Sequence, residues 1–214
     1  NLISNKHKIV ITTHVNPDGD AIGSSLALYN YLINMGHEVN VIVPNDFPDF
    51  LKWMHNVDEI LNFSNSKEES ADLISEASII FCLDFNNLER INSLGDLISD
   101  SSAKKVLIDH HLEPDGFYDF KIHDTNASAT AELVYDFLFY IDPKLIDKKI
   151  AEALYTGILT DTGSFKFSIT PKVHTVIASL LDKGVDTNYI NKKIYDSNSF
   201  DKLKLMGYAL SEKL

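Results

Sequence analysis

The chain has 214 residues, 44% of them apolar, and a formal net charge of −12 from 19 basic and 31 acidic residues, which is enough length for a substantial core. An acidic chain repels polyanions, which argues against a broad nucleic-acid groove but not against a small phosphate ester held through cations. The single cysteine, Cys82, excludes a disulfide framework and fits a reducing, cytoplasmic compartment, and no apolar run approaches the ~20 residues of a membrane span.

Short β-branched runs alternate with helical stretches. Four nearly all-apolar runs are typical of strands buried on both faces of a parallel sheet, namely residues 9–13, 39–43, 79–83 and 106–108. Between the first two, apolar residues recur at helical spacing from Ile22 to Ile33, and Gly36 ends that helix. Phe117–Ile122 adds a fifth strand. The pattern predicts an α/β fold with a doubly wound, mostly parallel five-stranded sheet and helices on both faces.

From about Ala129 the pattern becomes helical. We expect four helices in this C-terminal part, over residues 129–140, 148–160, 171–183 and 188–195. Pro171 suits the first turn of a helix, and Gly184 suits a helix end. The polar residues 64–70 are typical of a surface loop or a helix start.

The segment THVNPDGD, residues 13–20, directly follows the first predicted strand. It places an imidazole and two carboxylates in a tight turn before a helix. An EF-hand would need Gly and Glu where Ala21 and Ala27 stand, and a P-loop would need Lys where Ser24 stands. An Asx-type turn with Asp20 as the helix N-cap is the structural alternative.

Acids and histidines also end later strands. Asp84 follows the third predicted strand, and Asp109-His110-His111 ends the fourth. Taken singly, each has a plain explanation as a cap, a turn or a loop histidine. In an open parallel sheet, however, ligands bind beyond the carboxyl ends of the strands. We therefore expect these residues to converge with His14 at one edge.

Asp161 lies at the end of a predicted helix, where the macrodipole disfavours an acid unless a cation is near, although a simple turn before Gly163 would also explain it. Imidazoles and carboxylates without a thiolate suit Mn²⁺, Mg²⁺ or Fe²⁺ better than a structural zinc. Two metals about 3.5–4 Å apart that share a carboxylate activate water for attack on phosphorus. The residues therefore fit divalent cations of this kind, and a shared carboxylate would allow two of them.

Four motifs resemble, in order and spacing, those of the DHH phosphoesterase superfamily: His14-x-x-x-Asp18-x-Asp20, Asp84, Asp109-His110-His111 and Thr160-Asp161-Thr162-Gly163. The resemblance covers nearly the whole chain, which is similar to the nanoRNase (oligoribonuclease)/pAp-phosphatase branch of RecJ-like proteins. It implies that residues 1–198 form the DHH catalytic domain and that residues 199–214 begin an interdomain helix. A glycine-rich, histidine-containing motif of a C-terminal DHHA1 domain is not found before Leu214, so we expect that domain to be absent from this chain.

The resemblance also implies two divalent cations, Mn²⁺ in the first place and Mg²⁺ in the second, and a role for each ligand. The two metals would be held by His14 with Asp18 and by Asp20 with His110 and Asp161, while Asp84 would bridge them. Asp109 would orient a histidine as a supporting partner. His111 would face the scissile phosphate as a hydrogen-bond donor or acid.

Substrate contacts are expected from Asn16, from Arg90 (the only arginine) and from Ser128 and Thr130 at a helix start. A surface salt bridge explains Arg90 equally well, and an N-cap explains the Ser128–Thr130 turn. The remaining histidines are expected to be ordinary surface or packing residues: His7, His37, His55, His123 and His174.

The implied activity is metal-dependent hydrolysis of short RNA oligonucleotides or of 3′-phosphoadenosine 5′-phosphate. Superfamily alternatives are a cyclic-dinucleotide phosphodiesterase, a manganese pyrophosphatase and a single-strand exonuclease, of which the exonuclease fits the charge of −12 worst. A degenerate, non-catalytic nucleotide sensor would have lost ligands, whereas every expected ligand is present. The expected partners are a short oligonucleotide or a nucleoside bisphosphate, without a membrane or a long duplex, and a homodimer is compatible with this reading.

Overall fold

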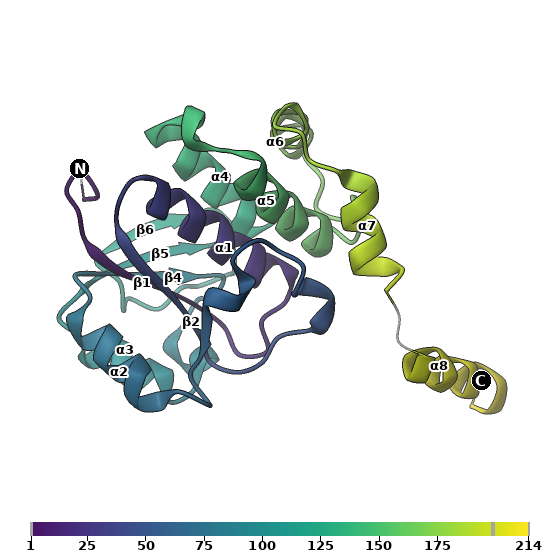
Figure 1. The fold of residues 1–214 in the computed structure, drawn as a ribbon, viewed down its shortest axis with the longest axis horizontal. Coiled ribbons are helices and arrows are strands. Elements are labelled where there is room, and N and C mark those ends of the chain that lie inside the picture. Colours follow the sequence, from purple (N-terminus) through teal and green to yellow (C-terminus); the bar gives the residue numbers. More distant parts are fainter. Residues whose placement is uncertain (1, 198–199, 214) are drawn as a thin grey trace.

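The computed structural model describes residues 2–197 and 200–213. One sheet of six parallel strands forms its centre, in the order β3-β2-β1-β4-β5-β6 (Figure 1). The strands are β1 (Lys8–Thr13), β2 (Glu38–Val43), β3 (Ile60–Asn62), β4 (Ile79–Leu83), β5 (Lys104–Asp109) and β6 (Phe120–His123). The α/β fold with a parallel sheet is confirmed, but the prediction of five strands was wrong by one. The additional strand, β3, has only three residues, too few to show any periodicity.

Among the described residues there are eight α-helices: α1 (Gly19–Asn34), α2 (Lys67–Glu76), α3 (Leu94–Asp100), α4 (Thr130–Ile141), α5 (Lys148–Asp161), α6 (Pro171–Asp182), α7 (Thr187–Tyr195) and α8 (Phe200–Glu212). Short 3₁₀ helices are η1 (Asp49–Leu51), η2 (Val57–Glu59), η3 (Leu88–Ile91) and η4 (Pro143–Leu145). The four predicted C-terminal helices, α4 to α7, are confirmed to within one residue at each end. No helix of this part of the chain is long and apolar enough to cross a membrane.

The sheet is covered on both faces, as its apolar strands predict. Ile9 and Ile11 of β1 pack into the core formed with α1, α4 and α5, whereas Val10 between them packs into the core formed with α2 and α3. Figure 1 shows α1, α4 and α5 on one side of the sheet and α2 and α3 on the other. The helix α8 stands apart from these layers. It occupies most of the predicted interdomain segment, whose end residues Ser199 and Leu214 lie outside the described residues.

The helices α1 and α5 cross in close contact at two glycines. A Cβ atom added at Gly23 would lie 2.6 Å from the carbonyl oxygen of Ala153. A Cβ atom added at Gly157 would lie 2.6 Å from the Ala131 Cβ and 2.8 Å from the Asp20 Oδ1. Only hydrogen fits at these positions, so the crossing brings the start of α1, which carries Asp20, against α5 near its end.

Candidate metal centre

The carboxyl edge of the sheet gathers the predicted ligands. His14 directly follows β1, Asp84 directly follows β4, and Asp109 is the last residue of β5. These three strands are neighbours in the sheet. The strand order reverses between β1 and β4, which makes this the topological switch point where ligands bind in open α/β sheets.

Asp18 and Asp20 have different structural roles at the start of α1. Asp18 is the N-cap, because its Oδ1 accepts hydrogen bonds from the backbone N–H groups of Asp20 (2.9 Å) and Ala21 (3.0 Å). The alternative of Asp20 as the cap was therefore wrong. The buried Asp20 carboxylate instead accepts from the N–H groups of Thr130 (2.6 Å) and Ala131 (2.9 Å), which begin α4. The N-terminus of α4 thus donates two hydrogen bonds to this carboxylate, which offset part of the cost of burying its charge.

Three groups of side chains have ligand atoms within 4.8 Å of one another: His14, Asp18 and Asp84; Asp20, His110 and Asp161; and Asp84, His110 and His111. Asp84 uses a different oxygen toward each histidine. Its Oδ2 lies 3.4 Å from the His14 Nε2, and its Oδ1 lies 3.7 Å from the His110 Nε2. The geometry is that of a carboxylate placed between two sites.

Hydrogen bonds fix the orientation of both histidine rings. The His14 Nδ1 lies 2.8 Å from the carbonyl oxygen of Val15, and the His110 Nδ1 lies 3.1 Å from that of Ala127. Each Nδ1 therefore carries a proton, and each Nε2 faces carboxylate oxygens. A carbonyl on the second nitrogen is the usual support of a metal-bound histidine.

The donor set fits divalent cations. Ligand atoms about 2.1 Å from a common metal lie roughly 3–4 Å from one another. The distance from the His14 Nε2 to the Asp18 Oδ1 is 4.0 Å, and that from the His110 Nε2 to the Asp161 Oδ2 is 3.6 Å. Carboxylate oxygens this close to Nε2 call for positive charge between the two groups, which a proton on the ring or a metal ion supplies.

Asp84 has a backbone conformation that side-chain-bearing residues rarely adopt, with φ of 66°. Its N–H donates to the carbonyl of Ile108 (3.1 Å), and the Thr130 hydroxyl donates to its Oδ1 (2.9 Å). The side chain is buried, with 3% of its surface exposed. Strained backbone of this kind persists where surrounding contacts impose it, most often at functional sites.

Two acidic groups of the cluster, Asp20 and Asp161, resist ionisation. Burial raises the pKa of Asp20 well above its ordinary value, and the charges of Asp84 and Asp161 add to this effect. Burial also raises the pKa of Asp161 to about 6, where Asp84 and Asp18 act in the same direction and His110 opposes them. Bound cations would relieve this repulsion.

We expect Asp161→Asn to stabilise the metal-free protein above pH 6. The raised pKa means that the folded state holds the Asp161 proton more tightly than the unfolded chain, so the stabilising contribution is present at low pH and is lost as pH rises through about 6. The uncharged amide of Asn does not lose this stability at high pH. The expected gain in the free energy of unfolding is on the order of 1 kcal/mol, because the Asp161 side chain is 31% exposed and solvent screens its charge. Thermal unfolding of the wild type and of Asp161→Asn in chelator, at pH 5 and pH 8, measures this difference. Equal stabilities of the two proteins at pH 8 would contradict the prediction.

His111 is held by Asp109. The His111 Nδ1 lies 2.7 Å from the Asp109 Oδ1, and this hydrogen bond is the main cause of a raised His111 pKa, which burial opposes and the charge of Asp84 supports. Asp109 is fully buried, and its Oδ2 has no hydrogen-bond partner among the described residues. With Nδ1 engaged, Nε2 is the nitrogen that can face a ligand.

Two supporting residues were not predicted from the sequence. The Nε2 of His123 lies 2.6 Å from the carbonyl oxygen of His111. The carboxylate of Glu132 accepts from the N–H (2.8 Å) and the hydroxyl (2.9 Å) of Ser128 and pairs with Lys172 (3.2 Å). The signal for His123 was its place at the end of β6, where it pairs with Asp109 in register. The expectation that His123 is a surface or packing residue stays a prediction, with this contact added.

Asn16 and Arg90 lie at the rim of the cluster. Asn16 is exposed, and it exchanges two hydrogen bonds with Asn45 (2.7 and 2.8 Å). The Arg90 carbonyl accepts from the N–H of Val15 (2.8 Å), and the charge of Arg90 lowers the pKa of His111. Substrate contacts by these two residues stay predictions.

Ser128 and Thr130 lie beneath the cluster. Both are buried, and their hydroxyls donate to the carboxylates of Glu132 and Asp84. The structure therefore shows them supporting other side chains, and it exposes neither of them to a ligand in solution. The N-cap of α4 is Ala129, in the middle of this turn and without a side-chain hydrogen bond, so the turn does cap the helix, although neither Ser128 nor Thr130 is the cap residue.

Known proteins match this chain in sequence. A family model described as "DHH family, N-terminal domain" matches residues 8–158. A protein of Thermus thermophilus is 33% identical over 208 residues, which covers 95% of this chain and 58% of the relative. A protein of Bacillus subtilis is 29% identical, covering 94% of this chain and 60% of the relative. Both are named bifunctional oligoribonuclease and PAP phosphatase NrnA.

Solved structures match it in fold. An exopolyphosphatase-related protein of Bacteroides fragilis superposes with a TM-score of 0.96 at 45% identity, covering 99% of this chain and 63% of that one. The exonuclease RecJ bound to manganese superposes with a TM-score of 0.51 at 14% identity over 81% of this chain and 43% of that one, a likeness of fold alone. The chain thus spans 58–63% of the length of the three more similar proteins.

Proposed function

Because this chain belongs to the DHH family, we propose that it is a two-metal phosphoesterase that hydrolyses short RNA oligonucleotides and 3′-phosphoadenosine 5′-phosphate. The observation that carries the chemistry is Asp84, whose two oxygens face His14 and His110. The substrates follow from the names of two relatives that match nearly the whole chain. The resemblance drawn from the sequence motifs is thereby confirmed at the level of the family.

We assign the ligands by the geometry of the cluster. The set is His14 and Asp18 for one cation, Asp20, His110 and Asp161 for the other, and Asp84 for both. We propose Mn²⁺ rather than Mg²⁺, since imidazole nitrogens accompany the carboxylates and Mg²⁺ prefers an all-oxygen shell. When bound, two such cations lower the pKa of water and neutralise charge on the phosphoryl group.

The chain's own residues orient and protonate the substrate. Asp109 holds the His111 ring through Nδ1 and raises its pKa, which favours the charged ring, the form that carries a proton on Nε2 as well. We propose that this Nε2–H donates to the phosphate and then to the leaving oxygen. Asp109 acts as a positioning residue, and Arg90 adds positive charge on the same side.

A substrate screen with the full-length protein tests the proposal. With Mn²⁺ we expect hydrolysis of a dinucleotide and of 3′-phosphoadenosine 5′-phosphate at least about tenfold faster than that of pyrophosphate or a cyclic dinucleotide. Chelator should reduce the rates by more than about 100-fold, and added Mn²⁺ should restore them. Hydrolysis that persists in chelator would contradict the two-metal chemistry, and a preference for pyrophosphate or a cyclic dinucleotide would reassign the substrate. A cytoplasmic location and a homodimer stay predictions.

A further inference from the structure

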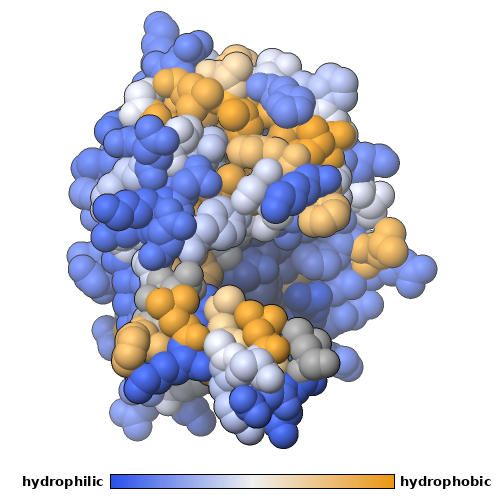
Figure 2. Space-filling view, turned by 90° about the vertical axis from the view of Figure 1, so that its right-hand side faces the viewer, coloured by the Kyte–Doolittle hydropathy of each residue, from blue (hydrophilic) through white to orange (hydrophobic). Residues whose placement is uncertain are grey.

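A groove beside the metal ligands extends the site away from the sheet. It reaches Asp18 and Asp161, has a volume of about 330 Å³, and takes its apolar lining from Phe50, Ile194 and Tyr195. That volume is at the lower end of the roughly 300–1,000 Å³ typical of small-molecule sites. Figure 2, which looks onto the side of the molecule that carries α7 and α8, shows a hollow with hydrophilic residues inside and hydrophobic residues along its rim.

Two aromatic rings line this groove from separate elements that pack together. Phe50 lies in η1, and Tyr195 is the last residue of α7. The Tyr195 hydroxyl donates to the carbonyl of Leu159 (3.5 Å), two residues before Asp161, and 41% of the Tyr195 surface is exposed. Aromatic faces beside a phosphate-handling centre are what nucleobases stack on.

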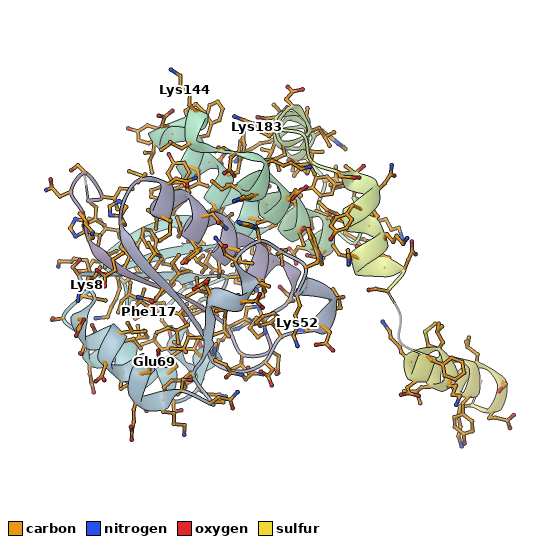
Figure 3. All side chains as sticks on the ribbon, in the orientation of Figure 1. Lys8, Lys52, Glu69, Phe117, Lys144 and Lys183 are labelled. Carbon is orange, nitrogen blue, oxygen red and sulfur yellow. The ribbon has the colours of Figure 1, made fainter. Side chains whose placement is uncertain are left out.

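A second hollow of about 390 Å³ shares Phe50 with this groove, and Lys52, Trp53 and Lys193 line it. Asp49 lines it too and forms an ion pair with Lys52 (2.6 Å). Trp53, the only tryptophan, packs edge-on against Tyr189 with ring centroids 5.4 Å apart. Figure 3 labels Lys52 on the side of the domain that faces α7 and α8. In a chain with a net charge of −12, lysines interleaved with aromatic rings form the pattern of a single-strand nucleic-acid track.

We propose that this groove is a nucleotide subsite. The base next to the scissile phosphate stacks on Phe50 and Tyr195, and the backbone phosphate of the following nucleotide lies against Lys52 and Lys193. The inference rests on the proposed function, because the metal-bound phosphate fixes where the base must lie. Stacking recognises the π-face that all bases share, so the subsite accepts any base and disfavours substrates without one.

Kinetics on the full-length, Mn²⁺-loaded protein test the stacking. The substrates are a dinucleotide and the same compound with one base removed. In the wild type, kcat/KM should favour the intact dinucleotide, and Tyr195→Ala or Phe50→Ala should reduce that preference on the order of tenfold by slowing the intact substrate alone. Tyr140→Ala is the matched control, since Tyr140 is 90% exposed and lies roughly 15 Å along α4 from Thr130. Loss of rate on both substrates alike in the groove variants would overturn the subsite.

A binding measurement without metal separates this inference from the proposed function. Adenosine, which is uncharged, is titrated into the metal-free full-length protein while the fluorescence of Trp53 is followed. We expect saturable quenching, with a Kd raised on the order of tenfold by Tyr195→Ala and unchanged by Tyr140→Ala. Quenching without any hydrolysis would support the subsite and refute the phosphoesterase. Hydrolysis with neither quenching nor base preference would refute the subsite and support the phosphoesterase.

Discussion

Asp84→Asn is expected to lower kcat/KM for phosphoester hydrolysis by roughly three orders of magnitude or more, with the fold intact. Replacing a supporting partner of a metal ligand typically costs about 10- to 100-fold, and a ligand shared by two metals costs more. The two Asp84 oxygens face His14 at 3.4 Å and His110 at 3.7 Å, and an amide keeps only one of them. Asn has the same size, tolerates φ of 66° and still accepts from the Thr130 hydroxyl.

The control for this variant is Asp72→Asn. Asp72 is an exposed residue of α2, which covers the face of the sheet opposite to α1, α4 and α5. Both variants should show the circular dichroism spectrum of the wild type, and only Asp84→Asn should lose Mn²⁺-dependent activity. If Asp84→Asn kept more than about a tenth of the wild-type rate, the bridging role of Asp84 would be excluded.

Gly23→Ala is expected to destabilise the fold by about 1–3 kcal/mol, the usual cost of overpacking. The added Cβ would lie 2.6 Å from the Ala153 carbonyl oxygen and 2.9 Å from the Gly157 nitrogen. Both are backbone atoms, so no side-chain rotation relieves the contact, and α1 and α5 must move apart. For a domain of this size that corresponds to a fall in Tm of roughly 2–12 °C. The helix propensity of alanine, about 1 kcal/mol better than that of glycine, offsets part of the loss.

Displacing α1 also displaces Asp20, which begins the same helix. We therefore expect Gly23→Ala to weaken Mn²⁺ binding as well as stability, as seen by thermal unfolding and by metal titration. Gly116→Ala is the matched control, because its Cβ would meet no atom within 4 Å. Equal unfolding temperatures for the two variants would contradict the close helix crossing.

Strands and helices were predictable where the chain was long and patterned. The apolar runs of β1, β2 and β4 lie buried on both faces and were recognisable from sequence. The strand β5 begins at Lys104, two residues before the predicted range 106–108. The prediction missed these two residues because both are lysines, which carry no apolar signal. The strand β3 was missed because three residues, Ile60–Asn62, show no periodicity.

The gathering of the candidate ligands was predictable because the carboxyl ends of parallel strands share one edge. The hydrogen-bond partners of the ligands could not be predicted, because those partners are distant in the sequence. The N–H groups that hold Asp20 belong to residues 130 and 131, and the site thereby depends on where α4 begins. The groove likewise joins Phe50 to Tyr195, which no local pattern connects.

Anomalous diffraction from crystals of the manganese-loaded protein tests the central claim, that two cations share one aspartate, most directly. The predicted result is two peaks about 3.5–4 Å apart, one beside His14 and the other beside His110, with the Asp84 carboxylate between them. A single peak, or two peaks of which only one contacts Asp84, would contradict it.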